Sequence, residues 1–178
     1  MCIRDSFNIY LNVVFMIDLI ESNLLDFPND INVIAHSCNT RNIMGAGIAK
    51  QIKDRYPEAY EADWRAFNSN YGVTLGKFSK ADIGDHKYIY NMYTQATIGT
   101  GREVDYEKFW QALKRVEQDL FEMKISKHEY DGSPPPVLGL PWGISCGLAG
   151  GNWEIISAMI NDIFVDSPIK VCIVKYHE

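Results

Sequence analysis

The sequence predicts an α/β protein, a three-layer α/β/α sandwich with a mixed, largely parallel central sheet. Short apolar segments alternate with amphipathic segments along nearly the whole chain. Most of the apolar segments are continuous rather than alternating, which is typical of strands that are buried on both faces of a parallel sheet. The 178 residues are 47% hydrophobic and 22% charged, a balance that can fill one sizeable core.

The first half of the chain contains two predicted strands followed by two predicted helices. Residues 13–20 and 31–36 are short, apolar and rich in β-branched side chains, which indicates buried strands. A helix is expected over 45–56, and Pro57 begins a second one that covers 58–67. The inward side of the first helix is formed by Ile48, Ile52 and Tyr56.

The second half repeats this alternation. A helix is expected over 105–123, with Asp105 as its N-cap, and another begins after Asn152. The segment 124–136 ends in three consecutive prolines, so it is expected to be an exposed loop. The remaining strands are expected over 75–81, 87–93, 137–140 and 169–174.

Composition excludes several classes of protein. With 23 acidic and 17 basic residues the chain lacks the basic field that drives general nucleic-acid binding. Its four cysteines and four histidines have no metal-ligand spacing. No apolar run approaches the about 20 residues of a membrane span, and no signal peptide is recognisable. We expect a cytoplasmic monomer without cofactor, metal or membrane partner: one domain over 7–178, with 1–6 as a non-native or disordered leader.

Two glycine-rich turns each connect a predicted strand to a predicted helix. The first runs through residues 36–49 and the second through residues 143–153. In an open α/β sheet such turns gather beyond the carboxyl ends of the strands, where ligands bind. Glycine lets backbone N–H groups approach phosphate oxygens, and the following helix adds its positive end. Two such turns suit a diphosphate, although glycines also occur in turns that bind nothing.

Other phosphate-binding motifs do not fit. A dinucleotide GxGxxG motif beginning at Gly45 would need glycine where Lys50 stands, and no P-loop motif occurs. A cysteine-phosphatase cradle would need an arginine six positions after Cys38 or Cys146, where the chain has Met44 and Asn152. The two cysteines are therefore interpreted as small packing residues.

The two turns and the segment between them resemble the signatures of the macro domain family. The stretch VIAHSCNTRNIMGAGIAKQIKDRYPEAY matches the first signature, and LGLPWGISCGLAGGNW matches the second. Between them, YIYNMYTQ and the helix VDYEKFWQAL complete a resemblance that covers residues 16–176. The most similar branch is the ADP-ribose-1″-phosphate phosphatase type, which is related to the terminal ADP-ribose protein glycohydrolases.

The resemblance implies a position for each part of ADP-ribose. Asn23, followed by Leu24, stands where many family members have an acid that contacts the adenine amino group, and its amide oxygen can accept the same hydrogen bond. Asn39 would orient the distal ribose. The diphosphate would be lined by Gly45, Ala46, Gly47 and Ile48 on one side and by Ser145, Cys146, Gly147, Leu148 and Ala149 on the other.

The catalytic residues of the family are only partly matched. The glycohydrolase branch uses a lysine nucleophile and an aspartate, and the matching positions hold Gln95 and Ala149. A covalent lysine route is therefore not expected. His36, at the predicted end of a strand, is the candidate acid or base for attack by water, next to Asn39. The alternative is a structural histidine that is satisfied by the backbone.

Several other residues near the turns have two interpretations. Arg102 and Asp105 could reach the pocket, or could be a solvated side chain and a helix cap. Trp142, Trp153 and Tyr176 could stack on adenine, or could belong to the core.

Three functions follow from the resemblance. The expected one is a hydrolase that removes the 1″-phosphate from ADP-ribose 1″-phosphate. The alternatives are a non-catalytic ADP-ribose reader, and a glycohydrolase that removes ADP-ribose from modified proteins or nucleic acid.

Overall fold

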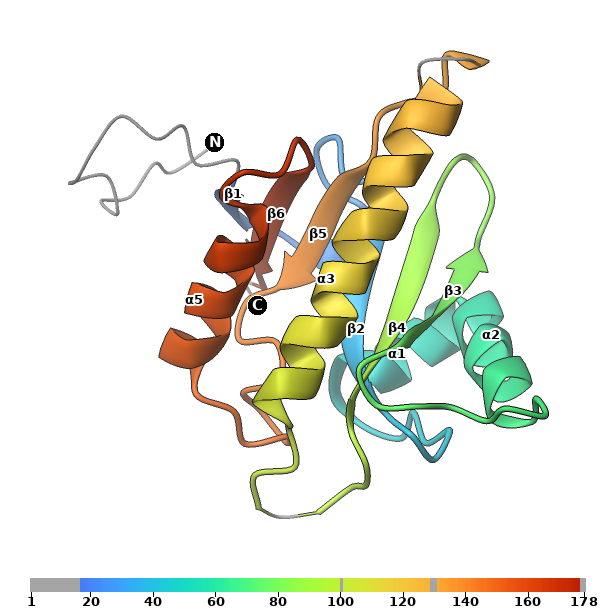
Figure 1. The fold of residues 1–178 in the computed structure, drawn as a ribbon, viewed down its shortest axis with the longest axis vertical. Helices are drawn as coiled ribbons and strands as arrows, with labels where there is room; N and C mark the ends of the chain where they lie inside the picture. Colours follow the sequence, from blue (N-terminus) through green and yellow to red (C-terminus); the bar gives the residue numbers. More distant parts are fainter. Residues whose placement is uncertain (1–16, 100, 129–130, 177–178) are drawn as a thin grey trace.

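A single six-stranded sheet forms the centre of the molecule (Figure 1). The computed structural model describes residues 17–176 except 100, 129 and 130. The strand order is β1-β6-β5-β2-β4-β3, and every neighbouring pair is parallel except β3 and β4. The predicted mixed, largely parallel sheet is thus confirmed. The strands are β1 (Ile17–Glu21), β2 (Val33–Asn39), β3 (Phe78–Asp82), β4 (Tyr88–Gln95), β5 (Val137–Pro141) and β6 (Lys170–Lys175).

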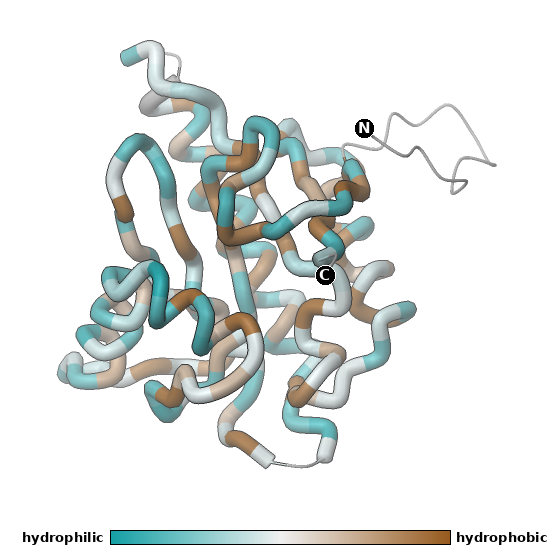
Figure 2. Tube along the Cα trace, turned by 180° about the vertical axis from the view of Figure 1, so that it is seen from behind, coloured by the Kyte–Doolittle hydropathy of each residue, from teal (hydrophilic) through white to brown (hydrophobic). Residues whose placement is uncertain are grey.

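Helices cover both faces of this sheet, which confirms the three layers. In Figure 1, α3 (Tyr106–Met123) and α5 (Trp153–Phe164) lie in front, and α1 (Gly47–Arg55) and α2 (Pro57–Phe67) lie behind. Alternate residues of β2 enter the two cores, because neighbouring side chains of a strand point to opposite faces. Val33 belongs to the α3 and α5 core, and Ile34 to the α1 and α2 core. Hydrophilic and hydrophobic segments alternate along the chain in Figure 2, as expected for helices with one apolar face.

Several predicted boundaries are wrong. β2 continues to Asn39, because Ser37 and Cys38 pair with β4 although their side chains are not typical of a strand. α1 begins two residues later than predicted, since Ala46 is extended. Lys124–His128, predicted as loop, forms a π-helix (η2) that continues α3. The predicted leader and residues 13–16 of the first predicted strand lie outside the described residues.

The chain changes direction across the sheet between β2 and β5. From β2 it passes through α1 and α2, on one face, to β3 and β4. From β5 it passes through α5, on the other face, to β6. β2 and β5 are hydrogen-bonded neighbours, so their carboxyl ends flank a topological switch point. Open α/β sheets bind ligands at such points.

Candidate functional site

The two glycine-rich loops meet at this switch point. The first loop, residues 40–46, follows β2, and the second loop, residues 142–152, follows β5. The Oγ atoms of Ser37, in β2, and Ser145, in the second loop, are 2.5 Å apart. The two loops therefore lie side by side at one edge of the sheet, as the sequence predicted.

Both loops present backbone N–H groups that have no acceptor among the described residues. Most of these donors are at exposed positions, but Ser145 and Ala149 are buried residues, where an unpaired N–H group is unusual. Cys146 differs from the prediction, because its N–H already donates to Gly143 O at 2.8 Å. Of the nine predicted diphosphate-lining positions, eight carry such an unpaired amide: Gly45, Ala46, Gly47, Ile48, Ser145, Gly147, Leu148 and Ala149.

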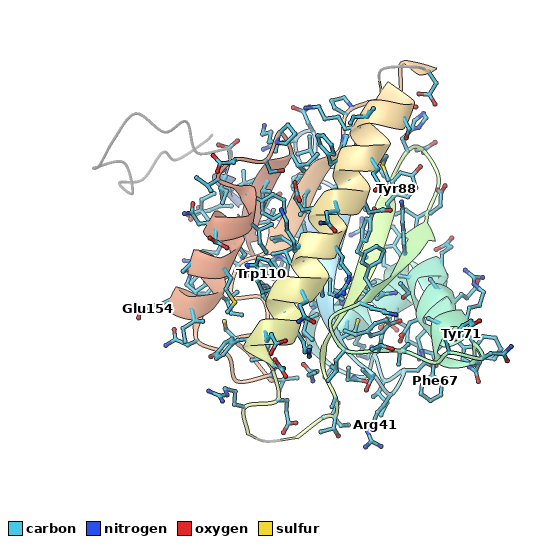
Figure 3. The ribbon with its side chains drawn as sticks, in the orientation of Figure 1. Arg41, Phe67, Tyr71, Tyr88, Trp110 and Glu154 are labelled. Carbon is cyan, nitrogen blue, oxygen red and sulfur yellow. The ribbon has the colours of Figure 1, made fainter. Side chains whose placement is uncertain are left out.

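Asn39 holds the shape of the first loop. Its Oδ1 accepts hydrogen bonds from Arg41 N at 2.9 Å and Ile43 N at 3.3 Å, and its Nδ2 donates to Ile43 O at 2.8 Å. The second N–H of the carboxamide has no acceptor among the described residues. Arg41, from the same loop, projects from the lower edge of the molecule in Figure 3.

The second loop is held by close backbone contacts. Ser145 adopts a left-handed conformation (φ 62°), which is uncommon for a residue with a side chain. Gly151 N donates to Ser145 O at 2.8 Å and closes the loop on itself. The N–H groups of Glu103 and Val104 both donate to Ala149 O, which joins this loop to the segment before α3.

His36 does not lie where the sequence placed it. The strand continues three residues beyond it, and its imidazole is 0% exposed. Its Nε2 is 2.7 Å from Asn91 Oδ1, an acceptor, so the neutral ring carries its proton on Nε2. Burial lowers the pKa of His36 to about 4, although the Asn91 hydrogen bond partly opposes this shift. The ring therefore belongs to the core and does not face the loops, contrary to the predicted acid or base role.

The predicted adenine-binding residues follow β1. Asn23 Oδ1 accepts from Leu25 N at 3.0 Å and caps the short 3₁₀ helix η1 (Leu24–Asp26). One lone pair of this oxygen is therefore already used within the protein. The Leu24 side chain is buried and packs beside Gly139 of β5, so only its backbone can face a ligand.

The two positions that the sequence resemblance matches to a catalytic lysine and aspartate have no reactive side chain. Gln95 ends β4 and donates from Nε2 to Thr97 O at 2.9 Å. Ala149 contributes one of the eight unpaired amides. Asp105 caps α3 by accepting from Lys108 N, and the Arg102 guanidinium lies 5.3 Å from the centre of the Tyr106 ring.

An aromatic cluster borders the second loop. The rings of Trp142 and Trp153 are 5.6 Å apart, and Lys175 Nζ lies 5.2 Å from the centre of the Trp142 ring. Trp142 and Tyr176 are exposed, and Trp153 is partly buried against the core. These side chains are at the carboxyl ends of β5 and β6, on the same edge of the sheet as the two loops.

Sequence reasoning missed a buried polar network beneath the first loop. Asn42 Nδ2 donates to Asp63 Oδ2 at 2.8 Å, and Tyr93 OH donates to Asp63 Oδ1 at 2.9 Å. Tyr93 OH is also 2.9 Å from Ser79 Oγ. The available signal was an acidic residue on the inward side of α2, one turn after the buried Ala59.

The described part of the chain contains neither a metal-binding cluster nor a membrane-spanning helix. Among residues 17–176, apart from the three omitted ones, no group of three or more His, Cys, Asp or Glu side chains could hold a metal ion. In the same residues no helix is long and apolar enough to cross a bilayer.

Comparison with known proteins identifies the fold. No family model matches the sequence. An uncharacterised 17.5 kDa protein of Enterobacteria phage T4 is 28% identical over 146 residues, which cover 80% of this chain and 85% of the phage protein. A DNA ADP-ribosyl glycohydrolase of Thermus aquaticus is 24% identical over 130 residues, 71% of this chain. The chain covers only 35% of that protein's length.

Solved structures extend this likeness over most of the chain. The macrodomain of Mycobacterium tuberculosis DarG has a TM-score of 0.71 and 21% identity, with 90% of this chain and 98% of that chain covered. Thermosipho africanus DarTG in complex with ADP-ribose has a TM-score of 0.68 and 18% identity, with 89% and 41% covered. The α/β/α sandwich described above is therefore a macrodomain fold.

Proposed function

We propose that this chain binds ADP-ribose, or a derivative substituted at the 1″ position, with the diphosphate between the two glycine-rich loops. The observation that carries this proposal is the set of eight unpaired amides on both sides of the switch point. N–H groups at a helix N-terminus and in a turn can hold an anion without a basic side chain. That chemistry suits a chain whose net charge is −6. The macrodomain fold, seen with ADP-ribose in Thermosipho africanus DarTG, supports the same ligand.

We further propose that the chain hydrolyses a bond at the distal ribose, and that the 1″-phosphate ester is its substrate. Gln95 and Ala149 offer no nucleophile or acid, which argues against a covalent glycosidic route. Phosphate transfer depends largely on positioning and on stabilising charge on the phosphoryl oxygens. Unpaired amides can supply this stabilisation, with water as the attacking group and Asn39 Nδ2 orienting the ribose.

A second candidate is release of ADP-ribose from nucleic acid or protein. The similarity to the Thermus aquaticus DNA ADP-ribosyl glycohydrolase favours it. Phosphate release from ADP-ribose 1″-phosphate, compared with ADP-ribose release from modified DNA and modified protein, separates the candidates. Phosphate release alone supports the phosphatase, and ADP-ribose release alone supports the glycohydrolase. Calorimetric binding without either product indicates a reader.

Introducing a negative charge into the first loop is expected to weaken ADP-ribose binding by about tenfold. Gly45→Glu is suitable because Gly45 is exposed and a Cβ there meets nothing closer than 3.7 Å, so the fold is retained. The added carboxylate repels the diphosphate. Gln118→Glu, on the exposed side of α3, adds the same charge far from the loops and is the control. Equal dissociation constants for both variants in calorimetry would remove the first loop from the site.

A further inference from the structure

Asp63 is a buried carboxylate without a basic partner among the described residues. Its side chain, on the inner side of α2, belongs to a residue that is only 1% exposed. Its hydrogen-bond donors are neutral: Asn42 Nδ2 and Tyr93 OH. Burial raises the pKa of Asp63, and these two hydrogen bonds oppose the shift. Such a group costs stability compared with an apolar side chain of similar size, so its presence needs another explanation.

Asn42, the partner of Asp63, is the point where the first loop turns. Its backbone is left-handed (φ 54°), a conformation that costs energy for most residues with a side chain. The N–H groups on either side of it, at Arg41 and Ile43, are held by Asn39 from β2. The loop is therefore fixed from two directions, by Asn39 from the sheet and by Asp63 from α2. Gly45, the first of the predicted diphosphate-lining positions with an unpaired amide, follows three residues later.

The hydrogen-bonded network continues from Asp63 and Tyr93 into the core. Tyr93 OH lies 2.9 Å from Ser79 Oγ, which also accepts from Asn91 Nδ2 at 2.9 Å. Asn91 in turn binds His36 and the backbone oxygen of Ala59 in α2. Every residue of this hydrogen-bonded network other than Asn42 is buried. A hydrogen bond from Asn42 to Asp63 thus couples an exposed loop to strands β2, β3 and β4 together.

We infer that Asn42 and Asp63 are positioning residues that hold the first loop in the shape that presents its unpaired amides to a diphosphate. This inference rests on the proposed function, because it assigns the network to the same site. Neither side chain contacts the ligand. They act through the backbone of residues 43–46, which connects Asn42 to the start of α1.

Removing the Asn42 side chain tests this inference without straining the backbone. Asn42→Gly keeps a residue that tolerates a left-handed conformation and deletes only the amide. We expect the ADP-ribose dissociation constant to rise about tenfold, the loss of one hydrogen bond to a charged group. Asn29→Gly is the matched control, since Asn29 is also left-handed (φ 56°) and precedes the opposite end of β2. Equal affinity of the two variants would overturn the inference.

An exchange of the two side chains distinguishes positioning from general stability. Asn42→Asp places two carboxylates opposite each other and should weaken binding more than Asn42→Gly does. The double variant Asn42→Asp, Asp63→Asn restores an amide–carboxylate pair and should recover most of the affinity. Failure of the double variant to bind more tightly than Asn42→Asp would contradict the inference.

A measurement without ligand separates this inference from the proposed function. NMR order parameters for the amides of Gly45–Ile48 should fall in unliganded Asn42→Gly relative to wild type and Asn29→Gly. Unchanged order parameters would overturn the positioning role. If wild-type protein fails to bind ADP-ribose while these amides lose order in Asn42→Gly, the proposed function fails and the positioning role stands.

Discussion

Lowering the pH from 7 to 4 is expected to destabilise the protein by about 3 kcal/mol through His36 alone. The imidazole is completely buried, and its burial lowers its pKa from 6.5 to about 4 in the folded state. Between these two pH values the unfolded chain binds a proton at His36 that the folded chain does not. Stability is therefore complete above about pH 6.5 and decreases as the pH falls toward 4.

The measurement compares urea unfolding free energies of wild type and His36→Gln at pH 7 and pH 4. Carboxylates elsewhere titrate in both proteins, so the difference between their pH dependences isolates His36. His36→Gln should be less stable at pH 7, because the Asn91 contact is disturbed, but it should lose about 3 kcal/mol less on acidification. His86→Gln replaces an exposed histidine and is expected to follow the wild type. An identical pH dependence in wild type and His36→Gln would contradict the assigned environment.

The same residue shows where sequence reasoning failed. His36, Ser37 and Cys38 are not typical strand formers, so the strand was predicted to end at His36 and to place its ring beside the first loop. Pairing with Asn91, Met92 and Tyr93 of β4 keeps these residues in the sheet. The partner of His36 is 55 residues away, and only the folded sheet brings the two together. The catalytic role of His36 was predicted from a local pattern that placed the end of the strand at His36. Pairing with β4 instead keeps His36 inside the sheet, away from the strand end.

The two glycine-rich loops could be predicted because their signal is local. A turn that must leave N–H groups unpaired favours small residues, and glycine or alanine stands at Gly45, Ala46, Gly47, Gly147 and Ala149. Eight of the nine predicted diphosphate-lining positions carry an unpaired amide in the structure. At the ninth position, Cys146, the N–H group donates to Gly143 O within the loop. The sequence does not specify the type of turn that makes this hydrogen bond. The support beneath the loop, from Asp63 and Tyr93, depends on the packing of α2 against the sheet and could not be predicted.

Gly151→Ala is expected to weaken ADP-ribose binding by about a hundredfold or more. A Cβ at this position would lie 2.6 Å from Ser145 O and 3.1 Å from Val104 Cγ1. Ser145 O is a backbone atom that already accepts from Gly151 N at 2.8 Å, so it cannot move away without opening the loop. Opening displaces the unpaired amides of the second loop together, which is why the expected loss exceeds that of Gly45→Glu.

The loss of stability in this variant should not exceed the loss of binding free energy, which is about 2.7 kcal/mol for a hundredfold weaker affinity. Overpacking of this kind costs about 1–3 kcal/mol, and the second loop lies at the surface, where it can relax. Gly84→Ala is the control for a strained glycine replacement elsewhere: its strain comes from the left-handed backbone (φ 84°) rather than from crowding, and it lies in the turn between β3 and β4. Calorimetry with ADP-ribose and thermal unfolding of both variants give the two quantities. Wild-type affinity in Gly151→Ala would mean that the second loop does not hold the diphosphate, and would leave the first loop as the sole support for the proposed site.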